Sequence, residues 1–426
     1  MTTRIDHPID VIGDVHGMYG RLRDLLSALG YARRDGRWSH DAGHRLVFVG
    51  DYVDRGRRPR EAVALVRDLC DDGMAIALLG NHDSNAIAFC MRAGRAVLDP
   101  QGAWHEGRSA LGTPRLSRRW LRRHHHLEEE AEFKNVRQHA ATLTGFDDPA
   151  AYEAAVRWFT TLPVWLELPG LRVVHAAWIP RAVACLDRWV ASRGLPSLGL
   201  RAPGFDEALA LQRARAASAP GEEAWHELLD LRGVPHAHQV PADRTPAVAL
   251  ERLLKGVEIR LPEGVSLPDA DGHGRNEIRM RWFEAARGRS FADVALMNTG
   301  DVARLAEVAR GHVIDAGRPG FDGVDALVCY SPADAYGPDE RPVIFGHYGL
   351  RLGAAPGHAR LLGCAAANVA CVDTAATAKA AEGGTLTAYR WAGEPRLSGE
   401  RFVGVSLDCA EDHAPTPVSD GRCTAP

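Results

Sequence analysis

The sequence predicts an α/β protein built around a parallel β-sheet. Three apolar runs, at residues 9–12, 46–49 and 75–79, each precede a stretch with the apolar spacing of a helix. This alternation of strand and helix is typical of parallel sheets with crossover helices. At 426 residues the chain exceeds what one hydrophobic core usually serves, so we also expect a large insertion or a second domain.

The elements follow in order from local patterns. Leu22, Leu25, Leu26 and Leu29 recur at helical spacing after the first apolar run, and Pro59 suits the first turn of a second helix. A third helix is predicted at 84–91. Further strands are predicted at 164–168, 171–174, 343–345, 369–372, 386–391 and 402–406.

Composition changes divide the rest of the chain. The segment 206–255 is rich in Ala, Leu and Arg and predicts helices, whereas the last residues are rich in Pro, Asp, Ser and Thr. The basic run at 118–126 directly precedes an acidic block, which favours a solvated helix. We therefore expect a core in two parts, residues 1–180 and 342–406. An insertion at 181–341 separates these parts, and a disordered tail follows at 407–426.

Charge and hydropathy exclude several classes of function. Lys plus Arg number 51 and Asp plus Glu number 55, a net charge of −4, which argues against general nucleic-acid binding. The chain has neither a long apolar run nor an apolar leader, so no membrane span and a cytoplasmic location are expected. The eight cysteines form no Cys-x-x-Cys pair, which predicts small buried side chains and no disulfide framework.

Polar side chains gather at the end of each early strand. The clusters are Gly13-Asp14-Val15-His16-Gly17, Gly50-Asp51-Tyr52-Val53-Asp54-Arg55-Gly56 and Gly80-Asn81-His82-Asp83. The carboxyl ends of parallel strands lie at one edge of a sheet, so these clusters should converge. Carboxylate, imidazole and amide ligands together suit Mn, Fe or Zn better than Mg or Ca alone.

Two later histidines have a similar context. His175 follows the apolar strand 171–174 and His347 follows the strand 343–345. A single histidine at a strand end is more often structural than a metal ligand. Five strand-end clusters in one chain reverse that expectation and predict one shared metal site.

The three motifs, in this order and about thirty residues apart, resemble those of the phosphoprotein phosphatase family of binuclear calcineurin-like metallophosphoesterases, and of its bacterial branch in particular. The resemblance covers residues 8–92, 163–178 and 342–391. It implies a calcineurin-like four-layer α/β/β/α sandwich, with a largely helical insertion over the metal face. A supporting role for Asp373, near the closing strands, is as plausible as a plain turn.

The resemblance also implies roles for individual residues. Two divalent metal ions, Mn first and Fe or Zn as alternatives, would be held by Asp14, His16, Asp51, Asn81, His175 and His347, with Asp51 bridging both. His82 would be the general acid, oriented by Asp54, and Arg55 would clamp the phosphoryl oxygens together with Asn81. The chemistry is consistent, because paired metals activate water and a guanidinium matches phosphoryl geometry.

The insertion adds two candidate substrate ligands. Arg279 and Arg281 alternate with apolar residues, which predicts a strand that presents two guanidinium groups on one face. One of them would form a second phosphate clamp. A solvated amphipathic strand fits the same pattern.

These observations favour a metal-dependent phosphatase that hydrolyses phosphate monoesters by attack of a metal-bridged water, with phosphoserine or phosphothreonine proteins as substrates. A dinucleoside polyphosphate hydrolase, acting on diadenosine tetraphosphate, is the alternative with the same chemistry. A catalytically silent metal-binding interaction module is the alternative of another class, although no ligand and no general acid is missing. The partners expected are therefore a phosphorylated protein or a nucleotide.

Overall fold

The computed structural model describes residues 5–93, 139, 141–146, 148–216, 220–230, 241–268, 274–286, 288–314, 336–337, 339–351 and 368–406. Two predictions lie outside these residues: the solvated helix at 118–126 and the disordered tail at 407–426.

The first sheet holds the early strands of the chain. Its order is β15-β16-β1-β4-β5, and β17 pairs with β16. The neighbours β1, β4 and β5 run parallel, as predicted, whereas β16 runs antiparallel to β1 and places Trp391 opposite Ile9. The strands are β1 (Ile9–Ile12), β4 (Arg45–Phe48), β5 (Ala75–Ala77), β15 (Asp373–Thr374), β16 (Thr385–Trp391) and β17 (Phe402–Val405).

The second sheet combines the middle and late strands. Its order is β14-β13-β7-β6-β8, in which β14, β13 and β7 are parallel and β6 is antiparallel to β7. Both predicted histidine-bearing strands, β7 and β13, are therefore direct neighbours. The strands are β6 (Trp165–Leu168), β7 (Leu171–Val174), β8 (Leu200–Arg201), β13 (Val343–Phe345) and β14 (Val369–Cys371).

The two sheets pack face to face through an apolar layer of their own. Ile9 and Val11 of β1 lie in one buried cluster with Val173 of β7 and Ile344 of β13. Because strand side chains alternate between faces, Ile12 points the other way, into the cluster that holds the helices. Full burial of one such aliphatic side chain contributes roughly 1.5–3 kcal/mol.

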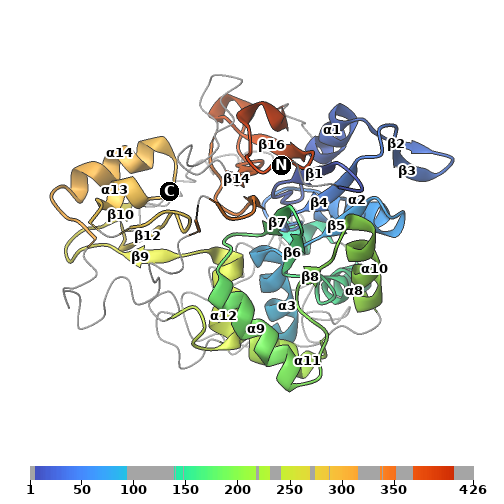
Figure 1. The fold of residues 1–426 in the computed structure, drawn as a ribbon, viewed down its shortest axis with the longest axis horizontal. Coiled ribbons are helices and arrows are strands. Elements are labelled where there is room, and N and C mark those ends of the chain that lie inside the picture. The colour runs from blue at the N-terminus through green and yellow to red at the C-terminus, as the bar shows by residue number, and fades with distance from the viewer. Residues whose placement is uncertain are drawn as a thin grey trace, which may run out of the picture.

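Helices cover the outer side of the first sheet (Figure 1). Leu22 of α1 (Tyr19–Leu29) and Val66 of α2 (Pro59–Asp71) are buried in the same cluster as Phe48 of β4. α3 (Asn81–Ala93) packs against α8 (Pro149–Phe159). This arrangement is the calcineurin-like mixed α/β fold that the sequence predicted.

The span 181–341 contributes to both the core and a separate lobe (Figure 1). β8 joins the second sheet, and α10 packs against β5 and β8. The lobe contains two small antiparallel pairs, β10–β11 and β9–β12. The elements are α9 (Pro180–Ser192), α10 (Phe205–Ala216), α11 (Glu222–Leu229), α12 (Pro246–Lys255), β9 (Glu258–Arg260), β10 (Leu267–Pro268), β11 (Gly274–Arg275), β12 (Glu277–Arg279), α13 (Phe291–Val294) and α14 (Thr299–Val308).

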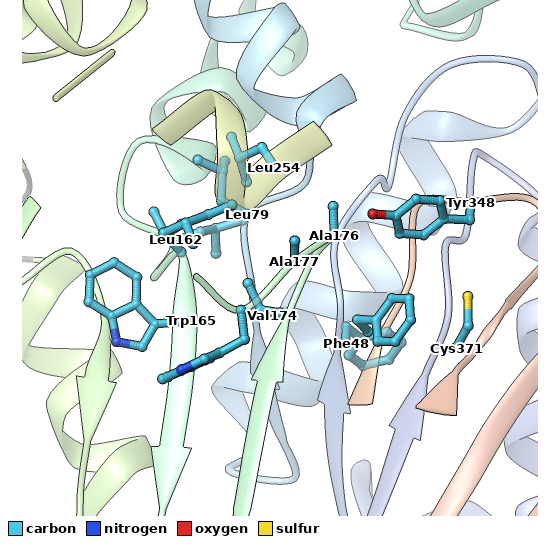
Figure 2. Packing of buried hydrophobic residues seen from close by; sticks show 14 of the residues in the cluster. Phe48, Leu79, Leu162, Trp165, Val174, Ala176, Ala177, Leu254, Tyr348 and Cys371 are labelled. Atoms are coloured by element: carbon cyan, nitrogen blue, oxygen red, sulfur yellow. The ribbon is translucent and has the colours of Figure 1, made fainter. Parts of the chain in front are cut away.

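The insertion packs onto the second sheet where that sheet carries its histidines. The backbone N–H of Ala176 donates to the Leu253 carbonyl of α12 over 3.0 Å. Figure 2 shows Ala176 and Ala177 beside Leu254, with Tyr348 on their other side. At Gly256, where φ is +79°, an added Cβ would lie 2.1 Å from the Tyr348 hydroxyl oxygen, so this close approach requires glycine. The end of α12 therefore sits against the residues that follow both His175 and His347.

Three local features differ from the sequence predictions. A polar hairpin, β2 (Tyr31–Arg34) with β3 (Arg37–His40), was missed because it has no apolar alternation to reveal it. α3 begins at Asn81 instead of at residue 84, so the third motif forms its first turn. Two short 3-10 helices, η3 (Ala380–Glu382) and η4 (Gly399–Arg401), flank β16. The four cysteines among the described residues are free thiols.

Candidate active site

The structure brings the strand-end clusters of both sheets together. The loops after β1 and β4 carry Asp14, His16 and Asp51, and the loops after β7 and β13 carry His175 and His347. The side chains of His16 and Asp51 approach each other, as do those of Asp51, His175 and His347. All except His347, which is half-buried, are buried. The parallel-strand argument thus correctly predicts convergence.

The backbone of the site is unusual. Five residues with side chains have positive φ here: His16 (46°), Asp51 (57°), Asp54 (69°), Arg55 (65°) and His347 (75°). This left-handed region costs free energy for residues other than glycine, and such strain concentrates at functional sites. Glycines make the close approaches possible: a Cβ at Gly346 would lie 2.2 Å from Asp14 Oδ1.

Asp51 occupies the centre of the cluster. Its Oδ2 lies 3.6 Å from His16 Nε2, and its Oδ1 lies 3.5 Å from His175 Nε2. Each separation is too long for a hydrogen bond, yet about right for two ligands that each stand about 2.1 Å from one ion. The two carboxylate oxygens thus face two different histidines, which is the arrangement expected of a bridging ligand.

The tautomers of the two histidines support this interpretation. Nδ1 of His16 donates to the Val53 carbonyl and Nδ1 of His175 to the Val49 carbonyl, both over 3.0 Å. A carbonyl only accepts, so each neutral ring has its hydrogen on Nδ1 and directs the Nε2 lone pair at Asp51. Lone pairs that face a carboxylate repel it unless a cation lies between them. The donor set therefore fits divalent metal ions.

Asn81 connects the two later histidines. Its Oδ1 lies 3.0 Å from His175 Nε2 and 2.8 Å from His347 Nδ1. The backbone N–H of His347 donates to both oxygens of Asp14, each over 3.1 Å. His347 Nε2 is buried and has no hydrogen-bond partner among the described residues. Asn81 and Asp14, which follow strands of the first sheet, thus contact the histidines that follow strands of the second sheet.

The electrostatics of the site favour cations. Burial raises the pKa of Asp14 well above its usual value, and the neighbouring Asp373 and Asp51 raise it further. Burial lowers the pKa of His175, and burial followed by Arg279 lowers the pKa of His347. A divalent cation would accept the lone pairs of the neutral imidazoles and relieve the repulsion between the carboxylates, so this set of groups is stabilised when such a cation binds.

His82 and Asp54 form a separate pair beside this cluster. His82 Nδ1 lies 2.6 Å from Asp54 Oδ2, and the His82 ring meets the His16 ring edge-on, with centroids 4.7 Å apart. Burial alone would lower the pKa of His82, but Asp51 and Asp54 outweigh it and raise the pKa. Burial would raise the pKa of Asp54, but His139 and His82 outweigh it and hold the pKa below its usual value. The pair is built to keep a proton on the imidazole.

Two further carboxylates hold the backbone of the ligand loops. Asp83 accepts from the backbone N–H groups of Gly80, Asp51 and Tyr52, over 2.8–3.0 Å. Burial and then Asp51 raise its pKa to about 8, although those backbone donors lower it. Asp373 Oδ2 accepts from Gly349 N–H over 2.6 Å, two residues after His347, which favours the supporting role over a plain turn.

Three cationic side chains surround the cluster. Arg55 is exposed at the rim, and its charge lowers the pKa of His16 after burial does. The Arg279 guanidinium lies over the Tyr348 ring, 5.7 Å from its centroid. Arg279 and Lys255 both contribute to the lowered pKa of His347, after burial. Lys255, from α12, was not predicted as part of this site.

The prediction for Arg281 needs correction. β12 ends at Arg279, so the two arginines do not share the face of one strand. The Arg281 guanidinium is instead bonded to the Ala295 carbonyl and to Glu284, over 3.2 and 3.3 Å. The apolar alternation misled because Met280 forms only an isolated bridge, beyond which the chain turns.

Sequence reasoning also missed residues around Asp54. His139 and Thr142 come from a short helical stretch before α8, and both contact the Asp54 carboxylate. They lie at the end of the charge-dense segment that we interpreted as solvated. Their spacing of three places both on one helix face just before the Asp148-Pro149 helix start, but nothing in the sequence links that face to Asp54.

The chain belongs to the calcineurin-like phosphoesterase family: the family model matches residues 7–230, more than half of the chain. It is therefore a hydrolase of the metallophosphoesterase type, and this family uses divalent metal ions. Both the predicted family and the predicted class of fold are confirmed. Within the described ranges, no helix combines the length and apolarity that spanning a bilayer requires.

The curated relatives match only part of the chain. An asymmetrical bis(5'-nucleosyl)-tetraphosphatase of Oceanobacillus iheyensis is 37% identical over 22% of this chain and 37% of its own length. Its counterpart in Halalkalibacterium halodurans is 32% identical over 33% of this chain and 52% of its own. The matches thus span about a third to a half of these relatives. A solved metallophosphoesterase of Sphaerobacter thermophilus is 24% identical, with a TM-score of 0.22, over 42% of this chain and 54% of its own.

Proposed function

We propose that the cluster is a two-metal centre that hydrolyses phosphate esters and anhydrides. Asp14, His16 and Asp51 would hold one ion, and Asp51 with Asn81, His175 and His347 would hold the other. The proposal rests on one observation: Asp51 lies between His16 and His175, whose Nε2 lone pairs both face its carboxylate. The mixture of oxygen and nitrogen ligands favours Mn²⁺, with Fe or Zn as alternatives. When bound, such ions supply Lewis acidity and make water acidic enough to attack at neutral pH.

The residues of the chain supply the remaining chemistry. Arg55 offers a planar pair of donors to phosphoryl oxygens from the open side of the site. His82 would give the proton at Nε2 to the departing oxygen, since its Nδ1 is engaged by Asp54. Asp54 fixes the tautomer and orientation of His82, and it stabilises the protonated ring before that transfer.

The insertion extends the positive charge beyond one phosphate. Lys255 and Arg279 are close enough for their charges to lower the pKa of His347, after burial does, and 36% of the Arg279 side chain is exposed. A substrate with several linked phosphates would engage these groups together with Arg55. These three positively charged side chains favour a substrate with several linked phosphates over a monoester.

A pocket of about 480 Å³ in the insertion lies next to this side of the site. Its lining includes Glu277, which shares one face of β12 with Arg279, and Arg351, four residues after His347. The Arg351 backbone N–H donates to Asn298 of the lining over 2.7 Å. The volume of the pocket falls in the range of small-molecule sites. Apolar Leu267 and Met297 beside charged groups suit a nucleoside attached to phosphates.

We therefore favour a dinucleoside polyphosphate as the substrate. The names of the curated relatives, which match part of the chain, support this choice together with the pocket. Hydrolysis of phosphoserine or phosphothreonine in proteins, which the sequence alone favoured, becomes the alternative, because the metal chemistry is the same.

The test compares substrates on the full chain loaded with Mn²⁺. Diadenosine tetraphosphate, a phosphothreonine peptide and p-nitrophenyl phosphate are incubated side by side, and the products are separated by chromatography. We expect efficient cleavage of the dinucleotide, and Arg304→Ala in the pocket should raise the KM for it about tenfold without changing the KM for p-nitrophenyl phosphate. Phosphate release from the peptide without dinucleotide cleavage would move the protein to the phosphatase alternative.

A further inference from the structure

Asp54 is held by more than its histidine partner. Its Oδ2 faces His82 over 2.6 Å, whereas its Oδ1 accepts from His139 Nδ1 over 2.8 Å and from the Thr142 hydroxyl. The backbone N–H of Asp54 donates to the same Thr142 oxygen over 2.8 Å. All these residues are buried, with at most 7% of any of their side chains exposed. The carboxylate is thus fixed from both sides.

His139 is itself held in one orientation. Its Nδ1 donates to the carboxylate, and its Nε2 lies 2.7 Å from the Tyr152 hydroxyl. Tyr152 belongs to α8, is fully buried and packs against Phe146 with centroids 5.7 Å apart. Phe89 of α3 lies on another side of the His139 ring, 5.0 Å between centroids. The chain of contacts runs from α8 to the catalytic pair.

These contacts fix the orientation of the Asp54 carboxylate. Asp54 sits in a strained turn, with φ of 69°, where its backbone alone does not fix the plane of the carboxylate. His82 must present Nε2 to the departing oxygen, so a rotation of the carboxylate would swing the imidazole away from it. Two donors on Oδ1 oppose that rotation and, among the residues that the structure describes, leave Oδ2 to His82. Small misplacement of a catalytic group can cost large factors in rate.

We propose that His139 is a positioning residue for the general acid, acting on His82 through Asp54 and held in place by Tyr152. This inference rests on the proposed role of His82 and goes beyond it, because His139 lies outside the three motifs and 85 residues from Asp54. His139 touches neither the substrate nor a metal ligand in this assignment. Its influence should appear only in steps that need proton donation.

The kinetic test uses two esters that differ in their need for an acid. The phenolate that leaves phenyl phosphate is basic and needs a proton. The dinitrophenolate that leaves 2,4-dinitrophenyl phosphate is weakly basic and departs without one. His139→Leu fills similar space but removes the donor, and His139→Asn keeps a donor near the position of Nδ1. For the Mn²⁺-loaded protein we expect His139→Leu to lower kcat for phenyl phosphate about tenfold or more, with KM unchanged and a much smaller loss for the dinitrophenyl ester. His139→Asn should recover most of that rate.

A spectroscopic test does not depend on turnover. In ¹⁵N-histidine-labelled protein loaded with Zn²⁺, the Nδ1 protons of His82 and His139 should give two low-field resonances, assigned with His82→Gln and His139→Asn. In His139→Leu the remaining His82 resonance should shift or broaden, because its carboxylate partner becomes free to rotate. Tyr152→Phe should cause a smaller change in the same direction. Melting curves confirm that each variant is folded.

The outcomes separate the two proposals. If His82→Gln loses no more activity on phenyl phosphate than on the dinitrophenyl ester, the proposed general acid is wrong. If His82→Gln shows that difference but His139→Leu loses both activities equally, or loses none, the positioning role of His139 is overturned. An unchanged His82 resonance in folded His139→Leu would overturn it as well, even if neither ester is turned over.

Discussion

The two halves of the candidate site are built in different ways. On the side of the first sheet, Asp14, Asp51 and His82 come from three motifs in the first 83 residues, and each motif includes the glycines or carboxylates that shape its own turn. On the side of the second sheet, His175 and His347 stand alone in their loops. They are held by the first sheet through Asn81 and by α12 of the insertion.

This difference separates chemistry from substrate selection. In the proposed mechanism the first half supplies the bridging carboxylate and the proton donor, which any phosphoester substrate requires. The second half joins the metal cluster to Lys255, Arg279 and the pocket of the insertion. We infer that changes in the first half stop catalysis, whereas changes at the edge of the second half alter KM.

The largest effect is expected at Asp51. Asp51→Asn keeps the size of the side chain but removes the charge that both ligand groups share, so turnover should fall by at least about 10³-fold. The fold should persist, because the Asp83 carboxylate still holds the backbone of this loop. Phosphate release and circular dichroism check both statements. Full turnover in a folded Asp51→Asn protein would contradict the mechanism.

A loss on the other half comes second. His347→Ala should remove one of the two bound metal ions and lower kcat by about 10²-fold, with little effect on melting because His347 is only half-buried. Metal content measured by atomic emission provides the direct readout. His312→Ala, at an exposed histidine of the insertion, is the matched control and should keep both ions. Equal metal content in the two variants would remove His347 from the ligand set.

The arginines of the insertion provide a sharper comparison. Arg279→Ala should raise the KM for the favoured polyphosphate substrate about tenfold and leave kcat nearly unchanged, because one charged contact is lost in both ground and transition states. Arg281→Ala should not change the KM, since that guanidinium is bonded to Ala295 and Glu284. Steady-state kinetics on both variants decide the point. A similar KM increase in both would show that Arg281 also contacts the substrate.

The smallest effect is expected at Lys255. Its ammonium group is bonded to Glu251 over 2.7 Å, and 38% of the side chain is exposed, so solvent weakens its field. Lys255→Gln should raise the KM roughly two- to fivefold, mostly at low ionic strength. Lys379→Gln, at an exposed lysine outside the insertion, is the control. No difference between the two variants at low salt would show that Lys255 takes no part in binding.

The sequence predicted the parallel strands and their convergence because both follow from local rules. Apolar runs mark the buried strands, and polar clusters after them mark one edge of the sheet. Local patterns also marked most strands of the second sheet, whereas only the resemblance supplied their assembly into a separate sheet. The positions of His175 and His347 were readable because each directly follows an apolar strand.

Other parts of the site could not be predicted because they depend on contacts between distant segments. Lys255 looks like an ordinary residue at the end of a helix, and only the packing of α12 beside Tyr348 brings it to the metal cluster. His139 has no neighbouring motif, and its partner Asp54 is 85 residues away. Arg281 was misplaced for the converse reason: alternation describes a strand only as far as pairing continues.

The bond between the backbone of His347 and Asp14 joins residues that are 333 positions apart. On a ribosome that adds about 5–20 residues each second, Asp14 emerges roughly 15–70 s before its partner. During that interval the nascent chain already carries the acid–base pair and the bridging carboxylate but lacks its last metal ligand. Under the proposed ligand set, catalytic competence therefore arrives late in synthesis, and we expect a chain that ends before His347 to be inactive on phosphate esters.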